Sequence, residues 1–155
     1  MIGTGHPAIS REAATEQLML AKAARGLTYA EIAERLGRHP IWVGAALHGQ
    51  ATMSAEEAEK TAEVLGLGPE VAAALQQVPT RGTLESAIPK DPVLYRLYEL
   101  VQVYGTAIKG VLHEMFGDGI ISAIDCEIEL KRQEDPKGDR AVLTVNGKFL
   151  PYKKW

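Results

Sequence analysis

Arg96 and Glu99 lie three residues apart in a stretch whose apolar residues recur at helical intervals. On a helix this spacing places the guanidinium beside the carboxylate, on the flank of the apolar stripe instead of its solvent pole. A pair of this kind is usually a surface ion pair that contributes a few tenths of a kcal/mol. An arginine that borders an apolar face can also bind a small anion, and the carboxylate beside it can then handle a proton. The spacing alone leaves both alternatives open.

Ser122 is the next residue with a chemical use, because it follows a turn with two glycines in the run FGDGIISAID. Its hydroxyl and the neighbouring backbone N–H groups could donate to an oxyanion. Alternatively, a hydroxyl at the entrance of a strand bonds its own turn, and the residues by themselves favour this second interpretation. Ile120 and Ile121 are expected either to keep water out of a site or to pack in a core.

A long helix is expected to carry Arg96 and Glu99. Asp91 followed by Pro92 is typical of a helix cap and a first helical residue, and apolar residues recur at helical spacing as far as Gly117. The sequence therefore predicts one amphipathic helix between these two ends.

A small antiparallel sheet is expected after this helix. Apolar and charged residues alternate from Ile124 to Lys131, which predicts a half-buried strand that includes Cys126. QEDPKGDR predicts a turn, Arg140 to Val145 a returning strand, and the run NGK at 146–148 another reversal. Cys126 is interpreted as a packed residue and not as a catalytic thiol. Because two or three strands and one helix make a small core with open sheet edges, this part needs a partner, most simply a second copy.

Residues 1–85 are rich in alanine and predict a helical bundle. Thr28 with Glu31, and Ser54 with Glu57, have the spacing of capping boxes. The helices expected here lie between Thr28 and Gly37, from Pro40 to Leu47, and from Ser54 to Leu65. This arrangement resembles the helix-turn-helix of phage-repressor-like DNA-binding domains.

The chemistry of this bundle argues against DNA binding. A DNA reader needs cations for phosphates and polar side chains for base edges along its second helix. Here that helix reads HPIWVGAALHGQ, and residues 1–85 hold seven Lys and Arg against ten Glu, a formal charge of -3. We therefore expect the apolar face of the helix to pack on protein.

The chain changes character near residue 85. The run QVPTRGTLESAIPKDP carries Pro79, Gly82, Pro89 and Pro92, so it cannot be a continuous helix. After residue 85 the number of Lys and Arg equals the number of Asp and Glu. Two domains, 1–85 and 86–155, are expected. No stretch has the roughly 20 apolar residues of a membrane span, the N-terminus lacks the pattern of a leader, and the single cysteine suits a cytoplasmic protein. The histidines show no metal-ligand spacing, so no metal site is expected.

A contiguous run of the second domain, LYRLYELVQVYGTAIKGVLHEMFGDGIISAI, resembles the cyanase family, also called cyanate hydratase or cyanate lyase. The joints PTRG and IPKDP and the terminal NGKFLPYK extend the resemblance to nearly the whole chain. The resemblance implies an α+β fold. In it, a repressor-like helical bundle without a DNA-binding role precedes a long helix and a small antiparallel sheet that forms an intertwined dimer.

The resemblance also implies an activity, the bicarbonate-dependent decomposition of cyanate to ammonia and carbon dioxide through carbamate, which detoxifies cyanate and releases nitrogen. The catalytic residues would be Arg96, Glu99 and Ser122, and the substrate would contact Arg96, Ser122 and Ile121. No metal or organic cofactor is implied, because bicarbonate acts as a substrate. The family likeness further implies a homodecamer of five dimers with sites between subunits, in the cytoplasm, without nucleic-acid or membrane partners.

Two other functions follow from the same features. The first is a helix-turn-helix transcription regulator whose second domain oligomerises and senses a small anion; it requires salt-sensitive DNA binding, which the charge of residues 1–85 disfavours. The second is a purely structural oligomer, which would neither bind DNA nor release ammonia from cyanate.

Overall fold

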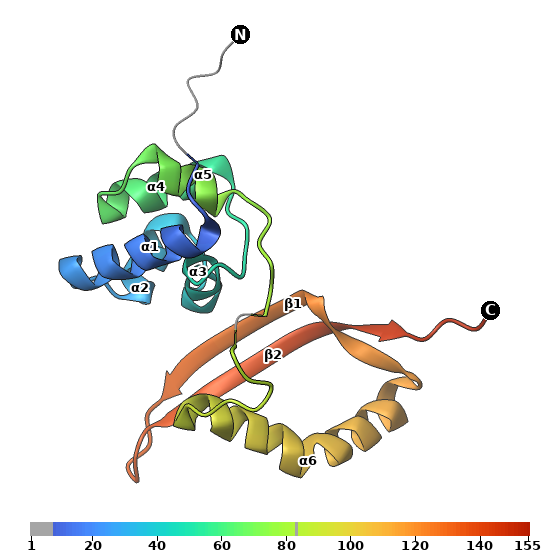
Figure 1. The fold of residues 1–155 in the computed structure, drawn as a ribbon. Helices are drawn as coiled ribbons and strands as arrows, with labels where there is room; N and C mark the ends of the chain where they lie inside the picture. The colour runs from blue at the N-terminus through green and yellow to red at the C-terminus, as the bar shows by residue number, and fades with distance from the viewer. Residues whose placement is uncertain (1–7, 83) are drawn as a thin grey trace. The chain divides into compact units, whose positions relative to one another are not determined.

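The computed structural model describes residues 8–82 and 84–155 and divides the chain into two compact units, Met1–Gly82 and Thr83–Trp155 (Figure 1). The described part of the first unit is helical. Its helices are α1 (Arg11–Arg25), α2 (Tyr29–Leu36), α3 (Pro40–Leu47), α4 (Ala55–Leu65) and α5 (Pro69–Leu75). The second unit holds α6 (Pro92–Phe116), β1 (Gly119–Gln133) and β2 (Arg140–Pro151). Across the described residues, no helix is long and apolar enough to cross a bilayer.

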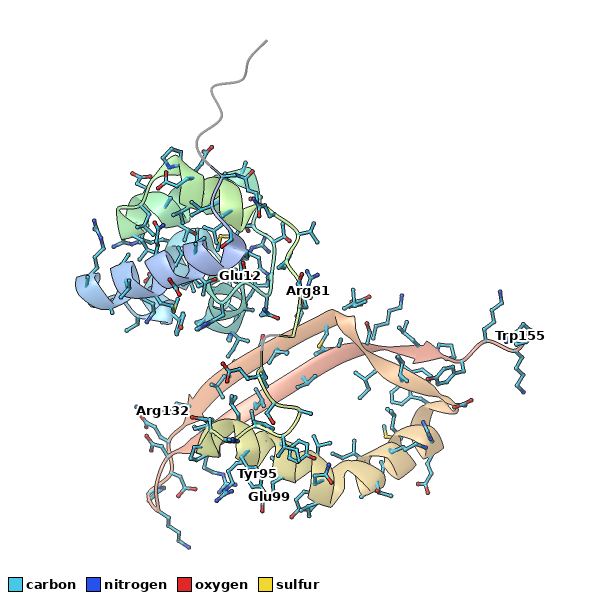
Figure 2. The ribbon with its side chains drawn as sticks, viewed as in Figure 1. Glu12, Arg81, Tyr95, Glu99, Arg132 and Trp155 are labelled. Atoms are coloured by element: carbon cyan, nitrogen blue, oxygen red, sulfur yellow. The ribbon has the colours of Figure 1, made fainter. Side chains whose placement is uncertain are left out.

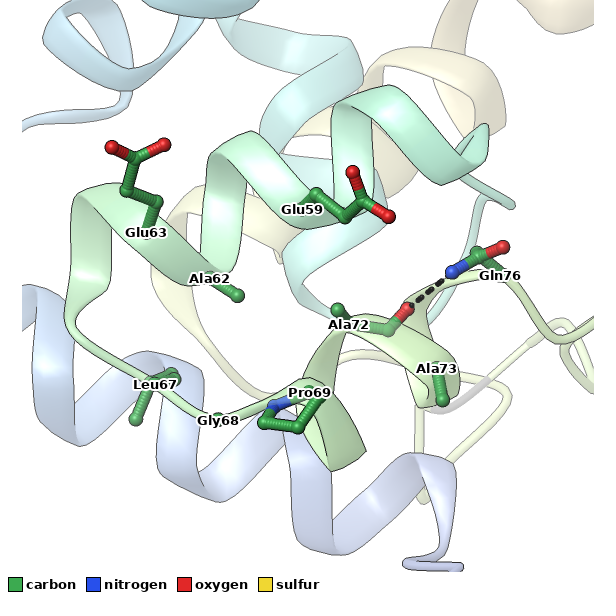
Figure 3. A pocket seen from close by; sticks show the side chains of 9 residues that line it. All are labelled: Glu59, Ala62, Glu63, Leu67, Gly68, Pro69, Ala72, Ala73 and Gln76. Carbon is green, nitrogen blue, oxygen red and sulfur yellow. Dashed lines mark hydrogen bonds between the residues drawn. The ribbon is translucent and has the colours of Figure 1, made fainter. Parts of the chain in front are cut away.

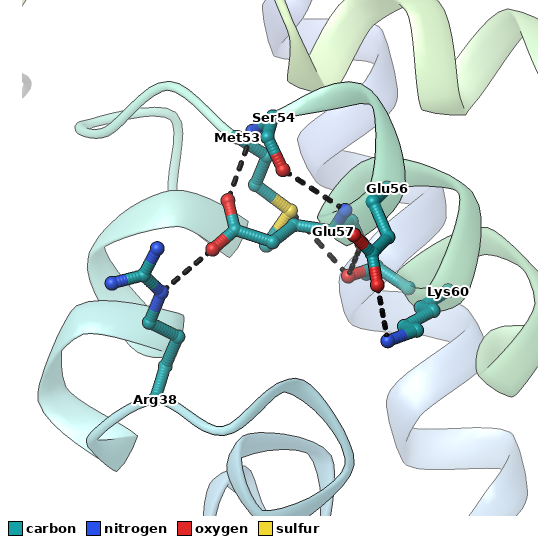
Figure 4. Close-up of polar contacts among 7 residues, drawn as sticks. Arg38, Met53, Ser54, Glu56, Glu57 and Lys60 are labelled. Carbon is teal, nitrogen blue, oxygen red and sulfur yellow. Dashed lines mark hydrogen bonds and ion pairs between the residues drawn. The ribbon is translucent and has the colours of Figure 1, made fainter.

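The two expected capping boxes are confirmed. The Thr28 hydroxyl accepts from the Glu31 N–H at 3.1 Å, and the Glu31 carboxylate accepts from the Thr28 N–H at 2.7 Å. This backbone hydrogen bond lowers the pKa of Glu31 below its ordinary value. Ser54 and Glu57 form the same reciprocal pair at 3.2 and 2.9 Å, and Glu57 also accepts from the Arg38 guanidinium (Figure 4). Local side-chain chemistry therefore fixes where α2 and α4 begin.

The first unit has a well-formed apolar core. α3 buries Val43, Ala46 and Leu47 in it. Ile41, Trp42 and Ala45 of the same helix are half-buried. The largest fully buried side chains of this core also include Leu18, Ile32, Leu65, Val71 and Leu75.

Arg11 joins three segments of this unit. Its guanidinium donates to the carbonyls of Ala74, Ala46 and Ala51 at 2.9, 3.1 and 2.6 Å, and these carbonyls lie at the ends of α5 and α3 and in the loop after α3. The last carbonyls of a helix have no intrahelical donor, so a guanidinium that reaches them supplies the missing hydrogen bonds. Burial lowers the pKa of Arg11 below its ordinary value.

The second unit pairs one long helix with one antiparallel hairpin. α6 begins and ends where the sequence predicts, since the Asp91 carboxylate accepts from the N–H groups of Val93 and Leu94 at 2.9 and 3.1 Å and the helix stops before Gly117. Figure 1 shows the hairpin lying along α6.

The sheet corrects two predictions. β1 begins at Gly119 and not at Ile124, so Ser122 lies inside the strand. The expected reversal at residues 146–148 is wrong, because β2 runs through them to Pro151, and Gly147 pairs with Cys126 of β1. An Asn-Gly pair predicts a turn only when no partner strand continues beside it, and here β1 continues as far as Gly119.

The second unit has almost no core of its own. No residue of α6 is buried, and among the described residues of this unit only Gly119 and Ser122 are. Apolar side chains on all three elements stay exposed, among them Leu100, Ile108 and Ile128. An uncovered apolar surface of this extent is typical of a subunit interface.

We expect the substitution Arg11→Ala to lower the free energy of unfolding by about 3 kcal/mol, because it removes hydrogen bonds from a charged donor to three carbonyls. The control is Glu16→Ala, on an exposed side chain of the same helix. Urea unfolding of the full chain, followed by circular dichroism, measures both. Equal stability of the two variants would show that the guanidinium does not hold the helices together.

Candidate active site

α6 carries Arg96 and Glu99 in its second turn, one turn after the Asp91 cap. Arg96 Nη1 lies 3.4 Å from Glu99 Oε2, and the two side chains are 69% and 48% exposed. The Arg96 guanidinium also lies over the ring of Tyr95, 5.6 Å from its centre. In Figure 2, Glu99 lies on the side of α6 that faces away from the hairpin. The predicted pairing is therefore confirmed, and among the described residues the guanidinium has one ion-pair contact, which uses one of its five donors.

Ser122 lies in an irregular stretch of β1. The strands pair at Ile121 with Phe149 and again at Cys126 with Gly147, so four residues of β1 stand opposite the single residue Lys148 of β2. We call residues 122–125 the β1 bulge. Bulges of this kind turn side chains in new directions and are frequent beside active sites.

The Ser122 hydroxyl organises the β1 bulge. Its oxygen accepts from the N–H groups of Ile124 and Asp125 at 3.1 and 2.9 Å, and the residue is only 5% exposed. A hydroxyl oxygen has two lone pairs, and both are used by these bonds. The one capacity left to it is its O–H, so Ser122 is suited to donate a hydrogen bond to an anion and poorly suited to act as a nucleophile.

The second interpretation of Ser122 from the sequence, a hydroxyl that bonds its own turn, is thus correct as a description of its acceptor side. The donor side remains compatible with the first. Within the part of the chain that the structure describes, no hydrogen bond joins Ser122 to Arg96 or Glu99. The structure therefore shows a direct contact between Arg96 and Glu99, and the hydrogen bonds of its described residues do not join Ser122 to that pair.

Ile120 and Ile121 line a hollow of about 480 Å³ between α6 and the start of β1, which we call the α6–β1 hollow. Apolar side chains of α6 form its other wall, including Val101, Ile108 and Leu112. Ile121 thus lies in a mostly apolar environment next to Ser122. This position suits a side chain that keeps water away from the serine.

Two polar residues of this hollow were missed by the sequence analysis. His113 Nε2 lies 3.2 Å from the Gly119 carbonyl, which can only accept, so this nitrogen carries the proton and donates. Lys109 Nζ lies 3.3 Å from the other ring nitrogen, Nδ1. His113 therefore ties the end of α6 to the start of β1. The signal in the sequence was the spacing of Lys109 and His113, four residues apart on one helical face.

A different hollow, of about 330 Å³, lies between α4 and α5 in the first unit (Figure 3). Glu59 and Glu63 stand at its rim, and the Gln76 amide donates to the Ala72 carbonyl at 3.1 Å. Because two carboxylates repel anions, this hollow is unsuited to a small negatively charged substrate.

The described residues contain no group of three or more His, Cys, Asp and Glu side chains that could hold a metal ion. The expectation of a reaction without metal or organic cofactor stays a prediction.

Comparison with known proteins relates both units to one family. The family model "Cyanate hydratase, N-terminal" matches residues 11–79, and "Cyanate lyase C-terminal domain" matches residues 86–154. The cyanate hydratase of Synechococcus sp. (strain CC9311) is 54% identical over 141 residues, 91% of this chain and 94% of that protein. That of Laccaria bicolor (strain S238N-H82 / ATCC MYA-4686) is 53% identical over 146 residues, 92% of this chain and 88% of that protein.

The fold agrees with these relatives. A crystal structure of cyanase from T. urticae matches with a TM-score of 0.81 at 41% identity, over 90% of this chain and 97% of that one. The expected α+β class, helices followed by a small antiparallel sheet, is confirmed. Since the matches extend over both units, the chain belongs to the cyanate hydratase (cyanate lyase) family of enzymes.

Proposed function

We propose that this enzyme decomposes cyanate in a bicarbonate-dependent reaction, with Arg96, Glu99 and Ser122 as catalytic residues. Bicarbonate attacks the cyanate carbon, the adduct loses carbon dioxide, and the remaining carbamate breaks down to ammonia and a second carbon dioxide. With two protons taken up, one cyanate and one bicarbonate give one ammonia and two molecules of carbon dioxide. Detoxification of cyanate in the cytoplasm is part of the same proposal.

The observation that carries the assignment is the Ser122 hydroxyl, whose oxygen is fully used as an acceptor and whose O–H is left to donate. Two small anions repel each other, so a site that joins them needs fixed positive charge and hydrogen-bond donors in a place that excludes water. Arg96 supplies a planar fork that fits a carboxylate-like group, and Ser122 supplies a donor held by the backbone. Glu99 orients the guanidinium and is within reach to move a proton.

A site shared between subunits is the second part of the proposal. One guanidinium and one serine hydroxyl per chain are few donors for two anions, and a site built from several copies multiplies them. The exposed Arg96 and the uncovered apolar surface of the second unit support an assembly in which another copy completes the site. We take this assembly to be a decamer of five intertwined dimers.

The reaction itself is tested by ammonia release from cyanate with and without added bicarbonate, in buffer freed of carbon dioxide. We expect ammonia only when both anions are present, because bicarbonate supplies the attacking oxygen. Equal rates without bicarbonate would exclude this route and favour direct hydration of cyanate. A gel shift with promoter DNA, run beside it, tests the regulator alternative.

Arg96→Lys is expected to keep the fold and assembly while lowering kcat/KM for cyanate by about 10- to 100-fold, since one charged hydrogen bond is worth about 1.5–3 kcal/mol. An ammonium keeps the charge but cannot form two parallel hydrogen bonds. The matched control is Arg132→Lys, on an exposed arginine of the same unit that also pairs with a carboxylate, that of Asp139. Near-normal turnover of Arg96→Lys would remove Arg96 from the mechanism.

Separated subunits are expected to be inactive. Mild urea or dilution dissociates the assembly, and sedimentation velocity and ammonia release on the same samples report mass and activity together. We expect mass and activity to fall in parallel. Within one chain, the hydrogen bonds of the described residues do not join Ser122 to Arg96, so the proposed site needs a second copy. Full activity in a monomer fraction would contradict a shared site.

A further inference from the structure

Gly147 occupies the place on β2 where the β1 bulge rejoins the sheet, opposite Cys126. Its φ lies outside the left-handed region, since the described glycines with positive φ do not include it. Any residue could therefore adopt the backbone conformation found here. What sets Gly147 apart is the space around it.

A Cβ atom at position 147 would have almost no room. It would meet the Cγ2 methyl of Ile121, and it would lie 2.7 Å from the backbone carbonyl oxygen of Ser122. Carbon atoms approach a neighbour to about 3.5 Å at their optimal separation. The Ile121 side chain can turn away, but the Ser122 oxygen belongs to the backbone and can move only if the β1 bulge moves with it.

We infer that Gly147 is a positioning residue for Ser122. Without a side chain at 147, the β1 bulge rests directly against β2, and this contact fixes where the Ser122 hydroxyl points. The inference depends on the proposed role of Ser122 in the reaction. It also explains why a glycine lies within a continuous strand, where it otherwise weakens pairing.

A second crowded glycine of the same sheet, Gly119, separates the contact with Ser122 from strand packing in general. Gly119 is also crowded, but the three atoms nearest to a Cβ there belong to the Leu150 carbonyl and the Phe149 ring. Gly119→Ala therefore introduces a comparable clash between the same two strands, and its nearest contacts are with β2 and not with Ser122. It is the matched control for a loss of strand packing.

The test uses the full chain in its assembled form and measures kcat and KM for cyanate at saturating bicarbonate. Gly147→Ala is expected to lower kcat by about 10- to 100-fold, since a displacement of about 1 Å in a catalytic group costs up to about 100-fold. Gly119→Ala is expected to lose less activity at an equal loss of thermal stability. A normal kcat for Gly147→Ala would overturn the inference.

A double-variant cycle separates positioning from packing. If Gly147 acts through the Ser122 hydroxyl, then Gly147→Ala should cost little further activity once Ser122→Ala has removed that hydroxyl. Independent, multiplicative losses would show that Gly147 serves the fold alone. Ser122→Ala separates the proposed catalytic role of Ser122 from the positioning role of Gly147. Normal activity of Ser122→Ala refutes the catalytic role. Loss of activity in Ser122→Ala together with normal activity in Gly147→Ala refutes only the positioning role.

A second variant covers the case in which Gly147→Ala does not assemble. Ile121→Ala combined with Gly147→Ala removes the methyl clash, so that the added Cβ presses on the Ser122 carbonyl alone. Compared with Ile121→Ala, this variant is expected to assemble and to show the same 10- to 100-fold loss of kcat. Failure of both variants to assemble would overturn the inference, because it would show that Gly147 is required for folding.

Discussion

The second unit of this chain cannot cover its own apolar surface, and the rest of the proposed chemistry depends on that constraint. One helix and one hairpin bury only a glycine and a serine among the residues described, while apolar side chains on α6, β1 and β2 stay exposed. Burial of apolar area is the main favourable contribution to folding and association. In the proposed assembly, further copies cover this surface and bring Arg96 and Ser122 of different chains together.

The Ser122 hydroxyl illustrates how a small polar group can be specialised by its backbone. Two N–H donors of the β1 bulge occupy its oxygen, so the group is held in place and its remaining hydrogen has a fixed direction. A donor that needs no reorganisation is what the stabilisation of developing negative charge requires. The same bulge explains the close contact at Gly147, since four residues of β1 are accommodated opposite one residue of β2.

The helical unit differs from the second unit because it has an apolar core and well-capped helices of its own. Its α3 packs Val43, Ala46 and Leu47 into the core, and Arg38, the cation that precedes α3, is paired with Glu57 and lies over the ring of Trp42. α3 itself carries no Lys or Arg to contact phosphates, and the expectation that this unit has no DNA-binding role stays a prediction.

The sequence by itself determined the features that depend on neighbours along the chain. The capping boxes at Thr28 and Ser54, the start of α6 at Asp91 and the pairing of Arg96 with Glu99 are interactions over two or three residues, so local pattern was enough. Only the tertiary structure decided how far β1 extends, that β2 continues through Gly147, and that both lone pairs of Ser122 are occupied. These features arise from the pairing of two strands whose register includes a bulge. The pair Asn146-Gly147 has the sequence typical of a hairpin turn, but here its glycine lies within β2 and leaves room for the β1 bulge.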